Sequence, residues 1–210
     1  MPDKKSLGTV IAKLEELFQL FNEHFYSGKL DQPVITVSPD TTSGAYGWCT
    51  GWKAWKSDSE SDEEGFYEIN ICAEYLKRPF GDICETLLHE MVHLYNLYAG
   101  VKDTSRGGTY HNKQYKAAAE EHGLNVAKDD KYGWTKTSLN DEAAIYIASL
   151  NQTMFDFQRS KIPAFMKKGG GKGSSSRKYV CPVCGCIIRA TKEVNVICGE
   201  CDVPFELDEG

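Results

Sequence analysis

The chain has 210 residues, which suits one medium-sized domain with a small second module. Its apolar fraction of 41% and aromatic fraction of 11% exclude an intrinsically disordered protein. A net charge of −6 does not indicate nucleic-acid binding by the surface as a whole. However, residues 158–192 contain nine basic residues and no acidic one, which leaves 15 basic and 30 acidic residues for the rest. This asymmetry predicts different partners for the two ends of the chain.

The N-terminal residues predict neither a secretory signal nor a membrane anchor. Residues 1–10 are polar, and the segment that follows, IAKLEELFQLF, carries charges within an amphipathic pattern. No uncharged apolar run is long enough to span a bilayer. We therefore expect a cytoplasmic protein without a membrane partner. In that compartment the eight cysteines are expected to be thiols and metal ligands rather than disulfides.

Helical and strand-like patterns are separated along the first 160 residues. Four segments have the apolar spacing or the capping residues of helices: 6–27, 78–100, 112–122 and 140–160. The second of these is apolar around most of its circumference, which predicts a core helix. β-Branched, aromatic and alternating segments between residues 33 and 72 predict the strands of a small sheet.

The segment KKGGGKGSSSRK, residues 167–178, contains no side chains that could form a core, and it predicts a flexible linker. We therefore expect one domain over residues 1–166 and a second, cysteine-rich module over residues 179–207.

Two histidines four residues apart occur in LLHEMVHLYN, residues 87–96. On a helix, His89 and His93 lie on one face one turn apart, so both rings can bind one zinc ion at about 2.0–2.1 Å. Glu90 is rotated by about 100° from His89, where it can reach a metal-bound water as a general base. The alternative is a pair of core histidines with ordinary hydrogen bonds. The pattern H-E-x-x-H on a buried helix favours the metal site.

A catalytic zinc needs a third protein ligand. We favour His111, because it follows a Gly-rich loop and begins a short helix, where the chain can fold back. His24 lies on the first helix and fits a packing role, and His122 fits a cation near a helix C-terminus. A carboxylate, Glu120 or Glu121, is the alternative ligand.

The C-terminal module contains two C-x2-C pairs separated by thirteen residues. Each pair can form a tight knuckle, and together they predict a tetrahedral structural zinc site. The alternative is a redox pair, but a module too small to form its own core favours a metal. The predicted ligands are Cys181, Cys184, Cys198 and Cys201.

Basic residues surround this module. Lysine and arginine can neutralise phosphates, and an aromatic ring can stack on a base, so we expect contacts with DNA, single-stranded or damaged, through the linker and the module. The alternative is that the lysines only keep the linker soluble. The residues predicted to contact nucleic acid are Arg177, Lys178, Tyr179, Arg189 and Lys192.

Two further sets of residues are expected to pack in the first domain. The isolated cysteines Cys49, Cys72 and Cys84 are expected to be small buried hydrophobes. The tryptophans Trp48, Trp52 and Trp55 are expected in the core, with an exposed strand edge that pairs with a peptide as the alternative.

Together, the segments ETLLHEMVHLYN and DTSRGGTYHNKQY and the four-cysteine module resemble the SprT-like (Spartan-type) metallopeptidases. LFNEHFYSGKL resembles the first helix of that family, and the resemblance covers about residues 8–205. It implies an α+β minimal zincin domain with an N-terminal helix, a small antiparallel sheet and the HExxH helix, followed by a small β zinc ribbon. It also implies that His111 is the third zinc ligand and that Tyr115 is the aromatic that follows it. The family often has glycine beside this histidine, whereas Tyr110 and Asn112 flank it here.

The resemblance implies a zinc-dependent endopeptidase with one catalytic and one structural zinc ion. His89, His93 and His111 would hold the catalytic zinc, and Glu90 would be the catalytic base. The substrate would be protein, and in the Spartan branch protein crosslinked to DNA. The alternatives are a DNA-binding scaffold without activity and an adaptor whose ribbon binds another protein. The sequence indicates no oligomeric state.

Overall fold

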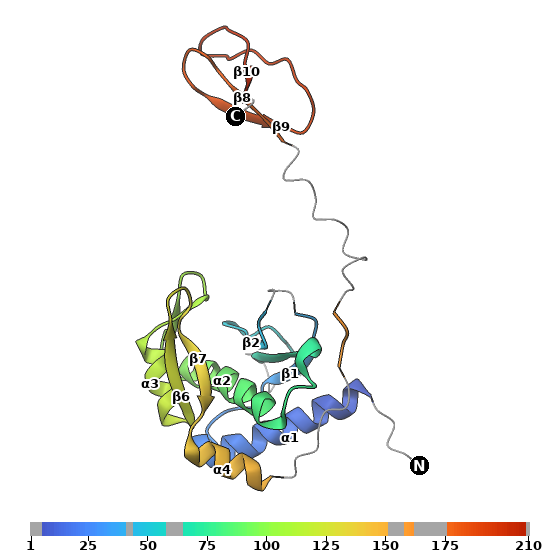
Figure 1. Cartoon of the computed structure of the whole chain (residues 1–210), viewed down its shortest axis with the longest axis vertical. Helices are drawn as coiled ribbons and strands as arrows, with labels where there is room; N and C mark the ends of the chain where they lie inside the picture. Colours follow the sequence, from blue (N-terminus) through green and yellow to red (C-terminus); the bar gives the residue numbers. More distant parts are fainter. Residues whose placement is uncertain (1–5, 41–43, 58–64, 151–157, 162–175, 209–210) are drawn as a thin grey trace. The chain divides into compact units, whose positions relative to one another are not determined.

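The computed structural model describes residues 6–40, 44–57, 65–150, 158–161 and 176–208. The chain divides into two compact units, Met1–Ser160 and Lys161–Gly210 (Figure 1). No described helix is long and apolar enough to cross a membrane.

The described part of the first unit contains four α-helices and two small sheets, so the expected α+β class is confirmed. The helices are α1 (Leu7–Tyr26), α2 (Phe80–Tyr98), α3 (Lys113–Glu121) and α4 (Asp141–Ser149), and η2 (Ala73–Tyr75) is a short 3-10 helix. The strands of the first sheet are β1 (Val34–Ser38), β2 (Gly47–Cys49) and β3 (Glu68–Cys72). Those of the second sheet are β4 (Thr104–Ser105), β5 (Tyr110–His111), β6 (Leu124–Asp129) and β7 (Gly133–Leu139).

The expectation of an antiparallel sheet is wrong, because both sheets contain a parallel pair. In the first sheet, with strand order β1-β3-β2, β3 pairs parallel to β1 and antiparallel to β2. In the second, β5 pairs parallel to β7 through His111 and Gly133, and β6 and β7 are antiparallel. Alternation along a strand reports which face is buried, but it does not report the direction of the neighbouring strand.

The β6–β7 hairpin lies beside α2 and α3 (Figure 1), and the sequence patterns did not indicate it. Its strands are mostly half-buried or exposed and contain lysine, asparagine and aspartate, residues that are depleted in strands. The turn is held by the Asp129 carboxylate, which accepts hydrogen bonds from the N–H groups of Lys131 and Tyr132. These turn contacts join residues that are close in sequence, whereas the hairpin packs on α2, which is distant in sequence.

The expected helix over residues 140–160 is too long. Asn140 caps α4 as predicted, since its side chain accepts a hydrogen bond from the Ala143 N–H. However, α4 ends at Ser149, and residues 151–157 lie outside the described residues. Arg159 is not helical; its N–H donates to the Ala73 carbonyl, and its guanidinium pairs with Glu74 at 2.6 Å.

The core of the first unit lies around α2. Its apolar residues are fully buried against α1, the first sheet and α3, as the all-round apolar pattern predicts: Leu87, Leu88, Met91, Val92 and Leu94. Cys72 and Cys84 are also buried, as expected, whereas Cys49 is only half-buried.

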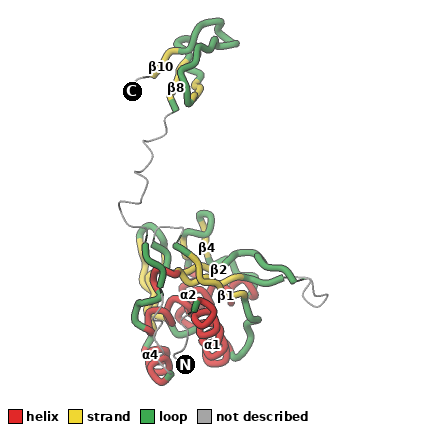
Figure 2. The backbone as a smooth tube through the Cα atoms, turned by 90° about the vertical axis from the view of Figure 1, so that its right-hand side faces the viewer, coloured by secondary structure: helices red, strands yellow, loops and turns green. Residues whose placement is uncertain are grey.

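The expectation that the three tryptophans pack in the core is wrong, because Trp48 is only half-buried and the other two are largely exposed. Trp52 is 67% exposed and Trp55 is 44% exposed. They belong to a hairpin whose described arms, residues 50–57 and 65–67, extend away from the helices (Figure 2), with Trp55 paired to Phe66. There the Trp55 Nε1–H donates to the Glu68 carboxylate at 2.7 Å instead of entering the core.

The second unit contains a three-stranded antiparallel sheet in the order β10-β8-β9 and a cluster of four cysteines, which is compatible with a zinc ribbon. Its strands are β8 (Arg177–Val180), β9 (Ile187–Ala190) and β10 (Glu206–Asp208). Because β8 begins at Arg177, residues 177 and 178 belong to the sheet rather than to the linker. The rest of the expected linker up to residue 175 lies outside the described residues.

Candidate metal centre

Three histidine rings converge in the first unit. α2 brings His89 and His93 to one face, and β5 brings His111 from a distant segment. The Nε2 atom of His111 lies 3.2 Å from that of His89 and 3.1 Å from that of His93. Three nitrogens bound tetrahedrally to zinc at 2.0–2.1 Å are about 3.3–3.4 Å apart. The three Nε2 atoms therefore fit a single zinc ion.

β5 reaches this position because its neighbour on β7 is a glycine. The His111 N–H donates to the Tyr132 carbonyl at 2.9 Å, and His111 pairs with Gly133. Gly133 has a φ of 77°, and a Cβ atom there would lie 2.1 Å from the His111 carbonyl oxygen. Only glycine permits this approach. On the other side of His111, the Asn112 side chain caps α3 and begins the helix.

Two of the three rings are oriented by side chains through Nδ1. His93 Nδ1 lies 2.7 Å from the Asp103 carboxylate, which also accepts a hydrogen bond from Asn96. His89 Nδ1 lies 3.2 Å from the hydroxyl of Thr137 on β7. A ring that donates through Nδ1 presents the lone pair of Nε2, which is the form that binds a metal.

Burial favours neutral rings at two of the three positions. It lowers the pKa of His89, and it lowers the pKa of His111 to about 4, with the neighbouring His93 adding to both effects. Burial also disfavours a charged His93, but the hydrogen bond to Asp103 outweighs it and raises the pKa of His93. A metal must displace any proton from these nitrogens, so neutral rings bind it more easily.

Glu90 follows His89 on α2 and is 5% exposed. Burial raises the pKa of its carboxyl to about 7, and a hydrogen bond with the Cys49 backbone opposes this rise. Gly47 on β2 makes room for it, because a Cβ atom there would lie 3.2 Å from Glu90 Oε1 and 2.7 Å from the Asn70 carbonyl oxygen. A carboxyl group with this pKa can both accept and release a proton near neutral pH.

A cleft of about 630 Å³ opens in front of the histidines and Glu90. β2 lines one side of the cleft, β7 lines the other, and α2 provides the floor. Within the described residues, β2 is at the edge of its sheet, with β3 on one side and no strand on the other. The cleft is therefore open to an extended chain along β2.

Tyr115 on α3 packs behind the rings. It is fully buried, and its ring centroid lies 4.9, 4.7 and 4.6 Å from those of His89, His93 and His111. An aromatic residue at this position is what the resemblance implied. The Tyr115 side chain thus supports all three rings from one side.

The alternative third ligands lie outside this cluster. His24 stacks on Tyr146 with ring centroids 3.7 Å apart. His122 does not sit in solvent as a helix-end cation; it is buried, and its Nδ1 lies 2.8 Å from the Phe25 carbonyl oxygen. Glu120 pairs with Lys116. The sequence patterns also did not indicate Asp103 and Thr137, because neither belongs to a motif with regular spacing.

A second candidate metal centre is the cysteine cluster in the other unit. Cys184 Sγ and Cys198 Sγ are 3.7 Å apart, and sulfurs bound tetrahedrally to zinc at 2.3 Å are about 3.8 Å apart. Hydrogen bonds from the backbone, first that of Cys184, lower the pKa of the Cys181 thiol to about 7. Cys186 is outside the cluster and exposed. The cluster consists of Cys181, Cys184, Cys198 and Cys201.

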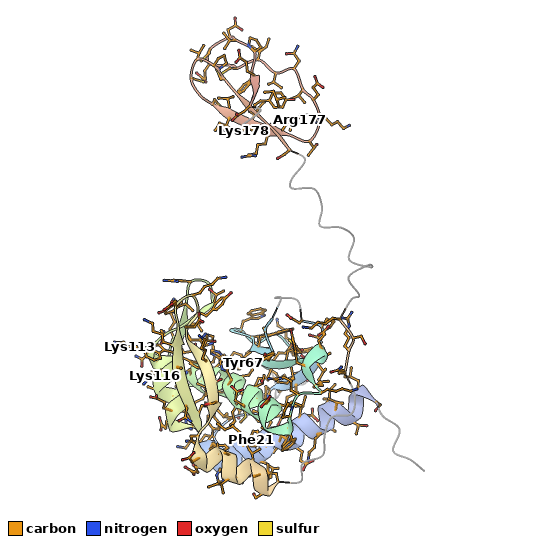
Figure 3. All side chains as sticks on the ribbon, in the orientation of Figure 1. Phe21, Tyr67, Lys113, Lys116, Arg177 and Lys178 are labelled. Atoms are coloured by element: carbon orange, nitrogen blue, oxygen red, sulfur yellow. The ribbon has the colours of Figure 1, made fainter. Side chains whose placement is uncertain are left out.

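The predicted nucleic-acid contacts all lie on this unit, and one of them is not available. Tyr179 is 5% exposed, and its hydroxyl accepts a hydrogen bond from the Val194 N–H, so its ring packs inside the unit instead of stacking on a base. Arg177 and Lys178 lie on β8 (Figure 3), and Lys178 pairs with Asp208. Arg189 on β9 and Lys192 in the following turn are exposed.

Comparison with known proteins identifies the family. The model of the SprT-like family matches residues 14–132, which include all three histidines. Over 96 residues, the chain is 36% identical to the DNA-dependent metalloprotease SPRTN of Bos taurus, a match that covers 45% of this chain and 18% of that protein. The matched region is thus less than a fifth of the relative's length. No solved structure matches the chain significantly. This chain belongs to the SprT-like family.

Proposed function

We propose that the chain is a zinc-dependent endopeptidase whose first unit is a minimal zincin domain. His89, His93 and His111 hold the catalytic zinc, and Glu90 is the general base. The observation that carries this proposal is the convergence of three Nε2 atoms next to a buried carboxyl group, in a cleft with a free strand edge. Membership of the SprT-like family and the similarity to a metalloprotease agree with it.

A zinc ion held by His89, His93 and His111 would supply a Lewis acid able to polarise the peptide carbonyl and to lower the pKa of a water molecule. Glu90 takes a proton from the attacking water and transfers it to the leaving amine. The substrate peptide pairs with the edge of β2 as an additional strand of the sheet, and this pairing places the scissile bond in front of the histidines.

The second unit holds a structural zinc on its four cysteines and binds DNA. Arg177, Arg189 and Lys192 are exposed on it, and the relative in Bos taurus is described as DNA-dependent. Phosphate contacts by these residues would bring the protease to proteins that are bound or crosslinked to DNA. Because Tyr179 is buried, the contact relies on charge and not on base stacking by this residue.

The protease proposal is tested with Glu90→Gln in the full chain. The substrate is an unfolded protein, incubated with and without single-stranded DNA, and cleavage is followed on gels together with the zinc content. We expect the variant to keep its zinc and to cleave at least about 100-fold more slowly, because it lacks the general base. Cleavage at the wild-type rate would refute the role of Glu90. A wild-type protein that binds zinc but cleaves nothing, even with DNA, would favour the scaffold alternative.

The DNA proposal is tested by fluorescence anisotropy with a single-stranded oligonucleotide at several salt concentrations. We expect affinity to fall steeply with salt, and Arg189→Ala to reduce the slope by about one unit. Lys136→Ala is the matched control, because Lys136 is an exposed basic residue on the first unit, where it pairs with Asp129. A slope unchanged by Arg189→Ala would contradict a phosphate contact at this residue.

A further inference from the structure

We propose that Thr137 and Glu85 position the metal-binding ring of His89 through a chain of hydrogen bonds. The Nδ1 atom of His89 lies 3.2 Å from the Thr137 hydroxyl oxygen, and this hydroxyl contacts the Glu85 carboxylate. The inference rests on the proposed zinc site but extends it to two residues outside the HExxH motif. They are positioning residues, because they act through His89.

The direction of the chain follows from counting protons. Burial raises the pKa of the Glu85 carboxyl, and the hydrogen bond from Thr137 and the positive charge of Arg78 oppose this rise. In its ionised form the Glu85 carboxylate carries no proton, whereas the Thr137 hydroxyl carries one. The hydroxyl must therefore donate to Glu85, and its lone pair is left to accept from His89 Nδ1–H. A ring protonated at Nδ1 has an unprotonated Nε2, which lies 3.2 Å from Nε2 of His111. The chain thus selects the tautomer that can bind zinc.

The three residues come from two elements that only the tertiary structure brings together. Glu85 and His89 are four residues apart on α2, so they lie one turn apart on the same helical face. Thr137 lies on β7, 48 residues after His89, and its hydroxyl inserts between them. The helix fixes the position of the His89 backbone, but the ring can still turn about its side-chain torsions. Thr137 removes this freedom.

The remaining ligands are held differently. His93 is paired directly with the Asp103 carboxylate, whereas His111 makes no side-chain hydrogen bond through Nδ1 among the described residues and is held by its backbone. Two carboxylates, Asp103 and Glu85, therefore lie behind three ligands that are uncharged when bound. With zinc bound, these carboxylates would oppose its +2 charge and strengthen the basicity of the imidazoles. The β6–β7 hairpin is thereby a part of the metal site.

The test compares Thr137→Val with Thr137→Ser in the full chain. Valine keeps the shape of threonine and removes the hydroxyl, and serine keeps the hydroxyl. Zinc affinity is measured by competition with a chelator. The cobalt-substituted protein distinguishes the histidine site from the cysteine site, because only the latter has thiolate charge-transfer bands. We expect the valine variant to bind metal at the histidine site about 10- to 100-fold more weakly, and the serine variant to bind nearly as wild type.

Thr135→Val is the matched control. Thr135 lies two residues away on the same strand and also lines the cleft, so this variant should keep wild-type affinity. Urea unfolding of the metal-free proteins shows whether the valine variant folds. As a direct readout, nitrogen-15 NMR of the zinc-loaded protein should show a protected proton on His89 Nδ1 that exchanges rapidly in Thr137→Val.

Wild-type affinity in Thr137→Val, or an equal loss in the valine and serine variants, would overturn the proposal. A valine variant that loses metal affinity, together with a wild type that cleaves no protein, would support the positioning role and reject the protease. Absence of metal from the histidine site of the wild type would reject both.

Discussion

Replacing Tyr115 by alanine tests whether packing behind the histidines contributes to stability as the structure indicates. The ring is fully buried and touches all three histidine rings. A buried tyrosine removes about 150–200 Å² from water, which at about 25 cal/mol per Å² corresponds to roughly 4–5 kcal/mol. This agrees with the ~3–5 kcal/mol measured for large aromatic-to-alanine changes in cores. With a urea m-value of about 2 kcal/mol/M, the unfolding midpoint should fall by about 2 M.

Tyr115→Phe is the matched control. It keeps the ring and removes a hydroxyl that donates to the His89 carbonyl at 3.5 Å, a weak hydrogen bond, so we expect a loss of no more than ~1 kcal/mol. All four tryptophans lie in the first unit, and their fluorescence therefore reports its unfolding separately from that of the ribbon. A midpoint shift below about 0.5 M for the alanine variant, or equal shifts for both variants, would refute the reasoning.

Three further predictions follow from the site and its surroundings. Gly133→Ala should weaken metal binding and destabilise the first unit, because its Cβ atom would clash with the His111 carbonyl oxygen. Gly107→Ala is the control: Gly107 also has a positive φ, but no atom lies within 4 Å of its Cβ position, so the free energy of unfolding should fall by only ~1–2 kcal/mol. Thermal unfolding and zinc content compare the two variants. Burial lowers the pKa of His122, so the folded protein binds this proton less readily than the unfolded chain. The contribution of neutral His122 to the free energy of unfolding is therefore complete above pH ~6.5 and declines as the pH falls below that value. We expect His122→Asn to make the free energy of unfolding, measured with urea, depend less on pH between 7.5 and 5.5. Cys198→Ser should remove one zinc equivalent and leave the tryptophan-detected transition unchanged, which metal analysis and urea titration can check; loss of that transition would contradict two independent units.

The expected helices were largely correct, because helix formation depends on residues close in sequence. α1 and α2 appear within two residues of the expected bounds, and the apolar pattern of α2 correctly indicates burial all round. The helix after Asn140 was too long, because its start has a local capping signal and its end has none. Strand direction and the β6–β7 hairpin were missed because they depend on partners far along the chain.

The sequence by itself determined the parts of the two candidate sites that lie within a few residues of each other. His89 and His93 share a helical face because of the 3.6-residue period, and each C-x2-C pair brings two thiols together within one knuckle. These relations hold wherever the helix or the knuckle sits in the fold.

The tertiary structure alone decided which distant residues complete the site. The sequence favoured His111 as the third ligand, but only the fold brings Asp103 and Thr137 to the His89–His93 pair, across 10 and 48 residues of chain. Burial of Tyr179 and exposure of Trp52 were likewise decided by packing. Such contacts depend on how separate elements bury their apolar faces together, and no spacing within a single element contains that information.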